Sequence, residues 1–181
     1  MKFEKTSFNG PLIVQPDVYE DSRGLFFESF NIKKYEEGGI TDKFVQDNIS
    51  TSRQNTIRGL HIQVGEKAQG KLCQVISGNV IDVVVDVRRN SQTFGKYFSI
   101  ELSDENHLQL WIPQGFAHGF SVLSPSAIFS YKCTGYYDKE SERSILFNDL
   151  DLAIDWGIDK PIVSDKDLNA LTFQQFISQY L

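Results

Sequence analysis

Short runs of β-forming residues follow one another along most of this chain, and turn-forming residues separate them. The runs lie at 12–15, 25–30, 43–50, 56–63, 71–76, 80–87, 96–102, 107–112, 118–123, 127–134 and 144–147. The breaks contain turn sequences such as Ser-Gly-Asn at 77–79 and Pro-Gln-Gly at 113–115. Many short strands at this spacing are typical of a sandwich or a barrel, so the pattern predicts an all-β body.

Helix signals stand at two places outside this succession of strands. Residues 31–39 begin with Asn31, a good N-cap residue, and end with two glycines. Residues 164–180 begin with Ser164 and carry apolar residues at helical spacing. No repeat, linker or low-complexity tract divides the chain. We therefore expect a single domain over 1–181, with a short helix near the N-terminus and helices at the C-terminus.

The composition limits the partners that such a chain can have. Its net charge of −6 argues against nucleic-acid binding, which needs clustered positive charge, but leaves room for a small phosphorylated ligand. No apolar run approaches the roughly 18 residues of a membrane span, and the N-terminus lacks the apolar core of a signal peptide. Cys73 and Cys133 lack Cys-x-x-Cys spacing, so we expect buried free thiols rather than a disulfide, and a cytoplasmic protein.

Polar residues interrupt the apolar run 80–87. Asp82 and Asp86 share one face of this predicted strand with valines, while the other face is entirely aliphatic. In one interpretation the aspartates lie on the solvent side of an antiparallel strand, and for Asp86 this interpretation is favoured. In the other, Asp82 faces a polar cavity inside a barrel. The pattern alone leaves both interpretations open for Asp82.

Three further residues stand in strand-like surroundings. Lys71 opens a run, a position where lysine is usually solvated. His118 lies between aromatic residues in the glycine-containing stretch 111–120, which is typical of a shaped loop at the mouth of a cavity or, alternatively, of a packed core histidine. Tyr131 shares a strand face with apolar residues. It is either a buried aromatic with a bonded hydroxyl or a phenol that points into a site as a proton donor.

His61 lies in the run 56–63, three residues after Arg58. Strict alternation places these two side chains on opposite faces of a strand. Gly59 stands between them, and a glycine inside a strand often marks a bulge. We therefore expect a kink at Gly59 that lets both side chains enter one site.

The motifs that usually mark metal or nucleotide chemistry are missing. His61, His107 and His118 form no His-x-His pair, and no Cys/His cluster is visible, so we expect no catalytic metal. The chain has no G-x-G-x-x-G after a strand, no G-x-x-x-x-G-K-[ST] and no G-x-S-x-G. Dinucleotide oxidoreductases, nucleotide hydrolases and serine hydrolases of those types are therefore disfavoured.

A series of longer blocks carries a family resemblance. In order, the blocks read DSRGLFFESF, FVQDN, RGLHIQ, AQGKL, IDVVVDVRRNSQTFGK, ELSDENHLQLWIPQGFAHGF, YKCTGYY and DWGIDKPIVSDKD. Their order and spacing closely resemble the dTDP-4-dehydrorhamnose 3,5-epimerases, over roughly residues 10–170. Each block alone is modest, but the ordered set is highly specific. One departure is Ile62, where family members often carry an aromatic residue.

The resemblance implies a cupin-type jelly roll, a homodimer, and an isomerase that uses neither a metal nor an organic cofactor. The implied reaction converts dTDP-4-dehydro-6-deoxy-D-glucose into dTDP-4-dehydro-L-rhamnose, for the L-rhamnose of bacterial surface polysaccharides. In this substrate the hydrogens at C3 and C5 both lie next to the C4 ketone. Their inversion needs a base, a group that stabilises the enolate, and an acid on the opposite face.

Matching motifs carry the family's roles onto residues of this chain. His61 is implied as the base, Asp167 as the partner of its other ring nitrogen, and Lys71 as the group that stabilises the enolate. Tyr131 is implied as the acid, provided that the site lowers its pKa or that it donates to a strongly basic carbanion. The implied substrate-binding residues, some of them from a partner subunit, are Arg23, Glu28, Gln46, Asn48, Arg58, Asp82 and His118.

Alternatives stay open at two points. Ser164 and Asp167 have the S-x-x-D spacing of a helix start, so the carboxylate of Asp167 has a second possible role at the helix N-terminus. The family resemblance favours the pairing with His61.

The alternative functions are an epimerase of C3 alone or of another 4-keto-deoxysugar nucleotide, a 3,4-ketoisomerase, and a cupin-like sugar-binding module without catalysis.

Overall fold

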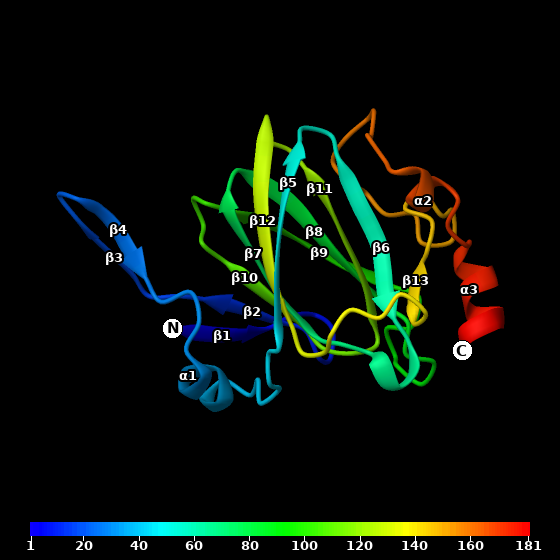
Figure 1. Ribbon diagram of the computed structural model, residues 1–181, viewed down its shortest axis with the longest axis horizontal. Helices are drawn as coiled ribbons and strands as arrows, with labels where there is room; N and C mark the ends of the chain where they lie inside the picture. The colour runs from blue at the N-terminus through cyan, green and yellow to red at the C-terminus, as the bar shows by residue number, and fades with distance from the viewer.

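Two antiparallel β-sheets face each other in the computed structural model, which describes residues 1–181 (Figure 1). The six-stranded sheet has the order β1 (Lys2–Lys5), β2 (Leu12–Gln15), β10 (Gln109–Ile112), β7 (Lys71–Ser77), β12 (Ser126–Cys133), β5 (Gln46–Arg53). The five-stranded sheet has the order β13 (Glu142–Ser144), β6 (Ile57–Gln63), β11 (Phe116–Val122), β8 (Asn79–Asp86), β9 (Tyr97–Ser103). Most neighbours in space are not neighbours in sequence, as in a jelly roll. The predicted all-β fold class is confirmed.

The remaining elements lie around this body. A hairpin of β3 (Val18–Asp21) and β4 (Gly24–Phe27) extends away from the two sheets, at the left in Figure 1. The helical elements are α1 (Ile32–Glu37), the 3₁₀ turn η1 (Gly65–Lys67), α2 (Asp165–Leu168) and α3 (Phe173–Tyr180). No helix is long and apolar enough to cross a membrane.

Helix caps explain where the helices begin. The side chain of Asn31 accepts a hydrogen bond from the backbone N–H of Lys34, so the predicted cap of α1 is confirmed. The predicted helical stretch 164–180 is two helices, since α2 ends at Leu168 and Thr172 starts α3 with a capping box.

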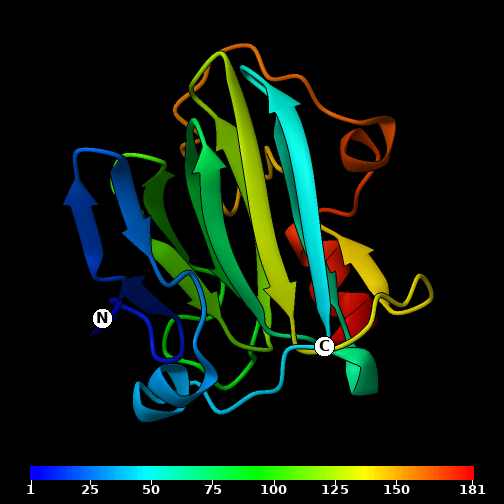
Figure 2. The same cartoon turned by 60° about the vertical axis from the view of Figure 1, so that its left-hand side comes forward.

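Apolar side chains pack in three layers. The inner cluster lies between the sheets and includes Cys73, Val84, Phe120 and Phe129. A second cluster covers the outer face of the five-stranded sheet with side chains of residues 145–181. Helices α2 and α3 of this segment lie at the right in Figure 2. A third cluster, around Tyr35, covers the outer face of the six-stranded sheet. The two sheets are therefore buried on both faces over much of their length.

This layering corrects one prediction about β8. Asp82 and Asp86 are both fully buried, so the interpretation that places them on a solvent-facing side is wrong. Side chains of the second cluster cover the aliphatic face of β8, and the aspartates lie on the face that points between the sheets. Asp86 accepts hydrogen bonds from the side chains of Arg88, Ser91 and Thr93, which hold the following loop.

Candidate active site

A bulge in β6 brings Arg58 and His61 to one side of the strand. Between the cross-strand pairs His61–His118 and Arg58–Phe120, β6 contains one residue more than β11. Gly59 occupies this bulge with φ +136°, and a Cβ added there would lie 2.5 Å from a Cα atom of β11. The predicted kink at Gly59 is confirmed.

His61 forms a close pair with Asp167 of α2. Its Nε2 lies 2.6 Å from Oδ1 of Asp167, and the backbone N–H of Gly59 donates to Oδ2 at 3.4 Å. Burial alone would raise the pKa of Asp167, but the bonds from His61 and Gly59 outweigh it and hold the pKa below its usual value. The hydroxyl of Ser164 caps α2, so the carboxylate of Asp167 faces His61 instead of serving the helix N-terminus.

Two cavities meet at His61. The first, here called the Lys71 cavity, has a volume of about 130 Å³ and receives residues from both sheets. It is lined by Gln46, Asn48, His61, Ile62, Gln63, Gln69, Lys71, Tyr131, Cys133, Tyr137 and Glu142. The second, here called the Arg58 cavity, has a volume of about 510 Å³. It is lined by Thr51, Ser52, Arg53, Thr56, Ile57, Arg58, His61, Ile162, Val163, Ser164, Lys166 and Asp167.

Lys71 and Tyr131 face His61 from the opposite sheet. Lys71 lies on β7 and Tyr131 on β12, and the Lys71 Nζ is 5.7 Å from the centre of the Tyr131 ring. Burial raises the pKa of Tyr131 to about 12. The site therefore does not lower this pKa, which leaves only the second of the two conditions for an acid: donation to a strongly basic carbanion.

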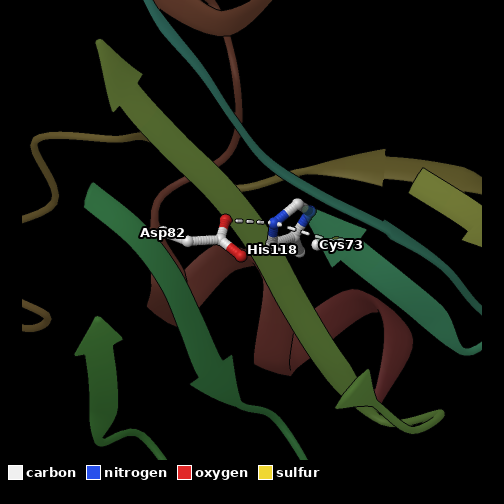
Figure 3. A group of neighbouring side chains, drawn as sticks. All are labelled: Cys73, Asp82 and His118. Carbon is white, nitrogen blue, oxygen red and sulfur yellow. Dashed lines mark hydrogen bonds and ion pairs between the residues drawn. The ribbon is translucent and has the colours of Figure 1, made fainter. Parts of the chain in front are cut away.

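His118 and Asp82 form a second buried pair, on β11 and β8 (Figure 3). The His118 Nε2 lies 2.5 Å from the Asp82 Oδ1 and 3.8 Å from the Cys73 Sγ. The sequence pattern predicted no cluster of metal-ligating residues, and the structure corrects this, because three strands bring these ligand types together. Two ligands on one zinc ion lie about 3.3 Å apart at tetrahedral geometry. The 2.5 Å separation is instead that of a hydrogen bond.

The remaining predicted residues fall into two groups. Gln46 and Asn48 line the Lys71 cavity and bond to each other, with the Gln46 Nε2 3.0 Å from the Asn48 Oδ1. Arg23 and Glu28 lie on or just after the β3–β4 hairpin and line neither cavity. Arg23 pairs with Asp21, and Glu28 pairs with Lys34 of α1.

Two polar residues at the site, Glu142 and Lys166, have no role in the sequence-based prediction. Glu142 lines the Lys71 cavity and accepts hydrogen bonds from the Tyr137 hydroxyl at 3.0 Å and from Lys166 at 2.6 Å. Lys166 lines the Arg58 cavity, so this ion pair stands between the two cavities beside His61. Lys166 directly precedes Asp167, so its position next to a predicted site residue could have indicated that it lies at the site. No local sequence pattern indicates such a position for Glu142.

Comparisons with known proteins point to one family. The sequence model of one family, described as dTDP-4-dehydrorhamnose 3,5-epimerase, matches residues 5–175. The enzyme of that name from Shigella flexneri is 49% identical over 174 residues, 96% of each chain. A crystal structure of the enzyme from Elizabethkingia anophelis matches with a TM-score of 0.92 and 52% identity, over 100% of this chain and 99% of that one.

A second solved structure carries a ligand. It is a dTDP-6-deoxy-D-glucose-3,5-epimerase from Legionella pneumophila in complex with dTDP-4-keto-L-rhamnose. It matches with a TM-score of 0.95 and 48% identity, over 99% of this chain and 96% of that one.

Proposed function

This chain belongs to the dTDP-4-dehydrorhamnose 3,5-epimerase family, and from that premise we propose that it converts dTDP-4-dehydro-6-deoxy-D-glucose into dTDP-4-dehydro-L-rhamnose. It is an isomerase that inverts C3 and C5 next to the C4 ketone. The observation that carries the proposal is the His61–Asp167 pair, which faces Lys71 and Tyr131 across one cavity between the sheets.

His61 is the base in this proposal. Because the carboxylate of Asp167 accepts a hydrogen bond from the Nε2–H group of His61, the lone pair of the ring lies on Nδ1, which takes the proton from the substrate carbon. The carboxylate then stabilises the imidazolium that forms. Lys71 places a positive charge where the enolate oxygen develops.

Tyr131 is the acid on the other side of the sugar ring. Its pKa of about 12 keeps the phenol protonated at neutral pH, so a proton is available for the carbanionic carbon. His61 and Tyr131 lie on different sheets, and this supports removal of a proton from one face and delivery to the other.

The Arg58 cavity supports binding of the diphosphate. Its cationic side chains are Arg53, Arg58 and Lys166, and Arg58 makes no ion pair within the chain. Charge-assisted bonds from guanidinium groups suit the geometry of phosphate oxygens. Gln46 and Asn48 line the Lys71 cavity, which supports a role for them in binding the sugar or the nucleoside.

A homodimer is part of the proposal. The β3–β4 hairpin extends from the body and exposes Tyr19, Leu25 and Phe26, each more than half exposed. Such a patch on an extended arm is typical of an interface. Because Arg23 and Glu28 lie at this hairpin and away from the cavities, a second copy would supply them to the site.

Two further parts of the proposal concern the cell compartment of the enzyme and its need for a metal or a cofactor. Cys73 and Cys133 are buried free thiols, as predicted, which supports residence in the reducing cytoplasm. The hydrogen-bonded geometry of the Asp82–His118 pair supports a reaction without a metal, and the four roles above require no organic cofactor.

Exchange with heavy water tests the function. The purified enzyme with authentic substrate is expected to introduce deuterium at both C3 and C5, as followed by NMR. Exchange at C3 alone would identify an epimerase of one centre, a 3-keto product would identify a ketoisomerase, and no exchange would identify a binding module. The His61→Ala enzyme is expected to lose exchange; exchange at the wild-type rate in this variant would contradict the mechanism.

A further inference from the structure

The β3–β4 hairpin has no strand partner in the body of the protein. β3 and β4 pair only with each other, as a separate two-stranded sheet. The hairpin extends away from the body in Figure 1, and Arg23 lies in the turn at its tip. A two-stranded hairpin gains little stability from its own pairing. The contacts at its base therefore decide the direction in which the tip points.

Gln109 binds the segment that leaves the hairpin. This side chain lies on β10 and is only 1% exposed. Its Nε2 donates to the backbone carbonyl of Ser29 at 2.8 Å and to Oε1 of Gln74 on β7 at 2.9 Å. Its Oε1 accepts a hydrogen bond from the hydroxyl of Tyr35 on α1. Both polar atoms of the Gln109 amide are thus bonded inside the chain.

These partners fix the orientation of the amide. A backbone carbonyl only accepts hydrogen bonds, so the NH₂ side of Gln109 must face Ser29. Tyr35 supplies the donor for the other side, because burial raises its pKa and keeps the hydroxyl protonated. Gln74 lies directly opposite Gln109 in the sheet and accepts the second N–H. Gln109 therefore forms a rigid link between the sheet, α1 and Ser29.

Two further contacts hold the base of the hairpin. The ring of Phe27, the last residue of β4, lies 5.1 Å from the ring of His107, just before β10. Glu28 directly precedes Ser29, and Lys34 of α1 pairs with its carboxylate. The position of Glu28 therefore follows the position of α1 and of the Ser29 carbonyl.

The length of the hairpin makes its tip sensitive to a movement at the base. Arg23 lies six residues before Ser29, a span of about 20 Å in an extended chain. A rotation of about 10° at the base would shift the tip by about 3.5 Å. A charge-assisted hydrogen bond, with an N–O distance of about 2.8 Å, is lost over such a shift. Binding of a ligand by Arg23 thus requires a fixed base.

We propose that Gln109 is a positioning residue for the site of a second copy of the chain. Its amide fixes the base of the hairpin, and the hairpin brings Arg23 and Glu28 to the nucleotide-sugar bound in the other subunit. The proposal rests on the proposed function and on the homodimer that is part of it. Gln109 lines neither cavity at His61, so it acts only through the hairpin.

Substrate kinetics of Gln109→Met give the first test. Methionine keeps the length of the side chain and removes both donors. The KM is expected to rise about 10-fold, the scale of one lost bond to a charged group. The kcat is expected to stay unchanged, because Arg23 and Glu28 bind parts of the ligand that do not react. An unchanged KM overturns the proposal.

Ser121→Ala is the matched control for a purely structural effect. It also removes a buried hydrogen bond, the one that the Ser121 hydroxyl donates to the carbonyl of Trp156 at 2.6 Å. This variant is expected to lose stability in urea and to keep the wild-type KM. An equal rise of KM in Ser121→Ala would show that any loosening of the fold has this effect, and would overturn the proposal.

Mixed dimers, purified through two different tags, show in which subunit Gln109 acts. Gln109→Met paired with His61→Ala has one active site, and the intact hairpin of the His61→Ala chain reaches it. This dimer is expected to have the wild-type KM. Wild type paired with a chain that carries both substitutions also has one active site, but the loosened hairpin serves it, so the raised KM is expected. The reverse pattern overturns the proposal.

Calorimetry with dTDP separates this proposal from the proposed function. A wild type that catalyses no exchange contradicts the function, and binding then tests Gln109 alone. Gln109→Met paired with Arg58→Ala is expected to keep one site of wild-type affinity, where an intact Arg58 and an intact hairpin meet. A mixed dimer without such a site overturns the proposal, and so does a monomeric wild type. If Gln109→Met fails to fold, Tyr35→Phe replaces it in every pairing, since it removes only the hydroxyl bonded to Gln109.

Discussion

At the scale of single residues, Asp167 offers the sharpest test of the proposed base. Asp167→Asn keeps the size of the side chain, but the amide presents an N–H to Nε2 of His61 and reverses the tautomer. The exchange rate is expected to fall about 1,000-fold or more, as in other His–carboxylate pairs. Asp165→Asn, an exposed acid in the first turn of the same helix, is the control and is expected to keep its activity. An Asp167→Asn enzyme near the wild-type rate would rule out the pairing as a catalytic device.

The same residue shows what a local pattern cannot determine. The S-x-x-D spacing predicted a helix start correctly, and the hydroxyl of Ser164 does cap α2. The hydrogen-bond partner of the Asp167 carboxylate lies on a strand that is 106 residues away in the sequence. Only the docking of α2 on β6 makes the pair, so family resemblance, and not spacing, identified it.

At the scale of elements, the bulge in β6 depends on Gly59. In Gly59→Ala the added Cβ would lie 2.5 Å from the Cα of Gly119, in a backbone conformation that L-residues rarely adopt. We expect a loss of about 3 kcal/mol in the free energy of unfolding, together with a loss of activity, measured by urea unfolding and heavy-water exchange. Gly135→Ala, where the nearest atom lies 3.4 Å away, is the control and is expected to be near neutral. A stable and active Gly59→Ala enzyme would contradict the role of the bulge.

The loop after β8 has a stability that depends on pH. Burial alone would raise the pKa of Asp86, but bonds from Arg88, Ser91 and Thr93 lower it from 3.8 to about 2. Because the folded value lies below the unfolded one, the stabilisation is present above about pH 4 and is lost as the pH falls towards 2. It amounts to about 2 kcal/mol.

Urea unfolding at pH 6 and at pH 2.5 checks this prediction about Asp86. The advantage of the wild type over Asp86→Asn is expected to shrink by most of that amount at the lower pH. Asp159→Asn, an exposed position, is expected to leave the pH dependence unchanged. A constant difference between wild type and Asp86→Asn would contradict the assignment.

Element prediction succeeded where hydrophobic patterning and turns agree. The central strands of both sheets and helix α1 lie within a few residues of the predicted ranges. Strands β1 and β3 were missed, since Lys2–Lys5 and Val18–Asp21 are short, polar and located at an edge or in the hairpin. The burial of Asp82 and Asp86 was also beyond prediction, because it depends on residues 145–181 covering the other face of β8.

At the scale of the whole molecule, the β3–β4 hairpin should control assembly. Replacing Leu25 and Phe26 by serine removes two of the exposed apolar side chains of the hairpin. If the hairpin forms the proposed dimer interface, the double variant is expected to sediment as a monomer. It is also expected to bind dTDP more weakly, because in the proposed dimer Arg23 of the second copy belongs to the site. Leu150→Ser, another exposed apolar position outside the hairpin, is the control and is expected to remain dimeric. If the hairpin variant remains dimeric, the hairpin is not the dimer interface and another surface forms it.

We also propose that residues 1–181 unfold as one domain. The inner cluster and the second cluster lie on opposite faces of the same strands, β8 and β11, so neither can open without exposing the other. A single coincident transition by fluorescence and circular dichroism is the expected result.

The placement of His61 and Tyr131 on different sheets has a consequence for isotopes. An epimerase with a single base can hand back the proton that it removed, which chemists call internal return. In the proposed mechanism the removed proton stays on His61 of the five-stranded sheet, while the incoming one arrives from Tyr131 of the six-stranded sheet. Each inverted carbon in the product should therefore carry hydrogen from the solvent, even after one turnover. In heavy water, the mass of the product sugar after one turnover would therefore report whether the base and the acid are two different residues.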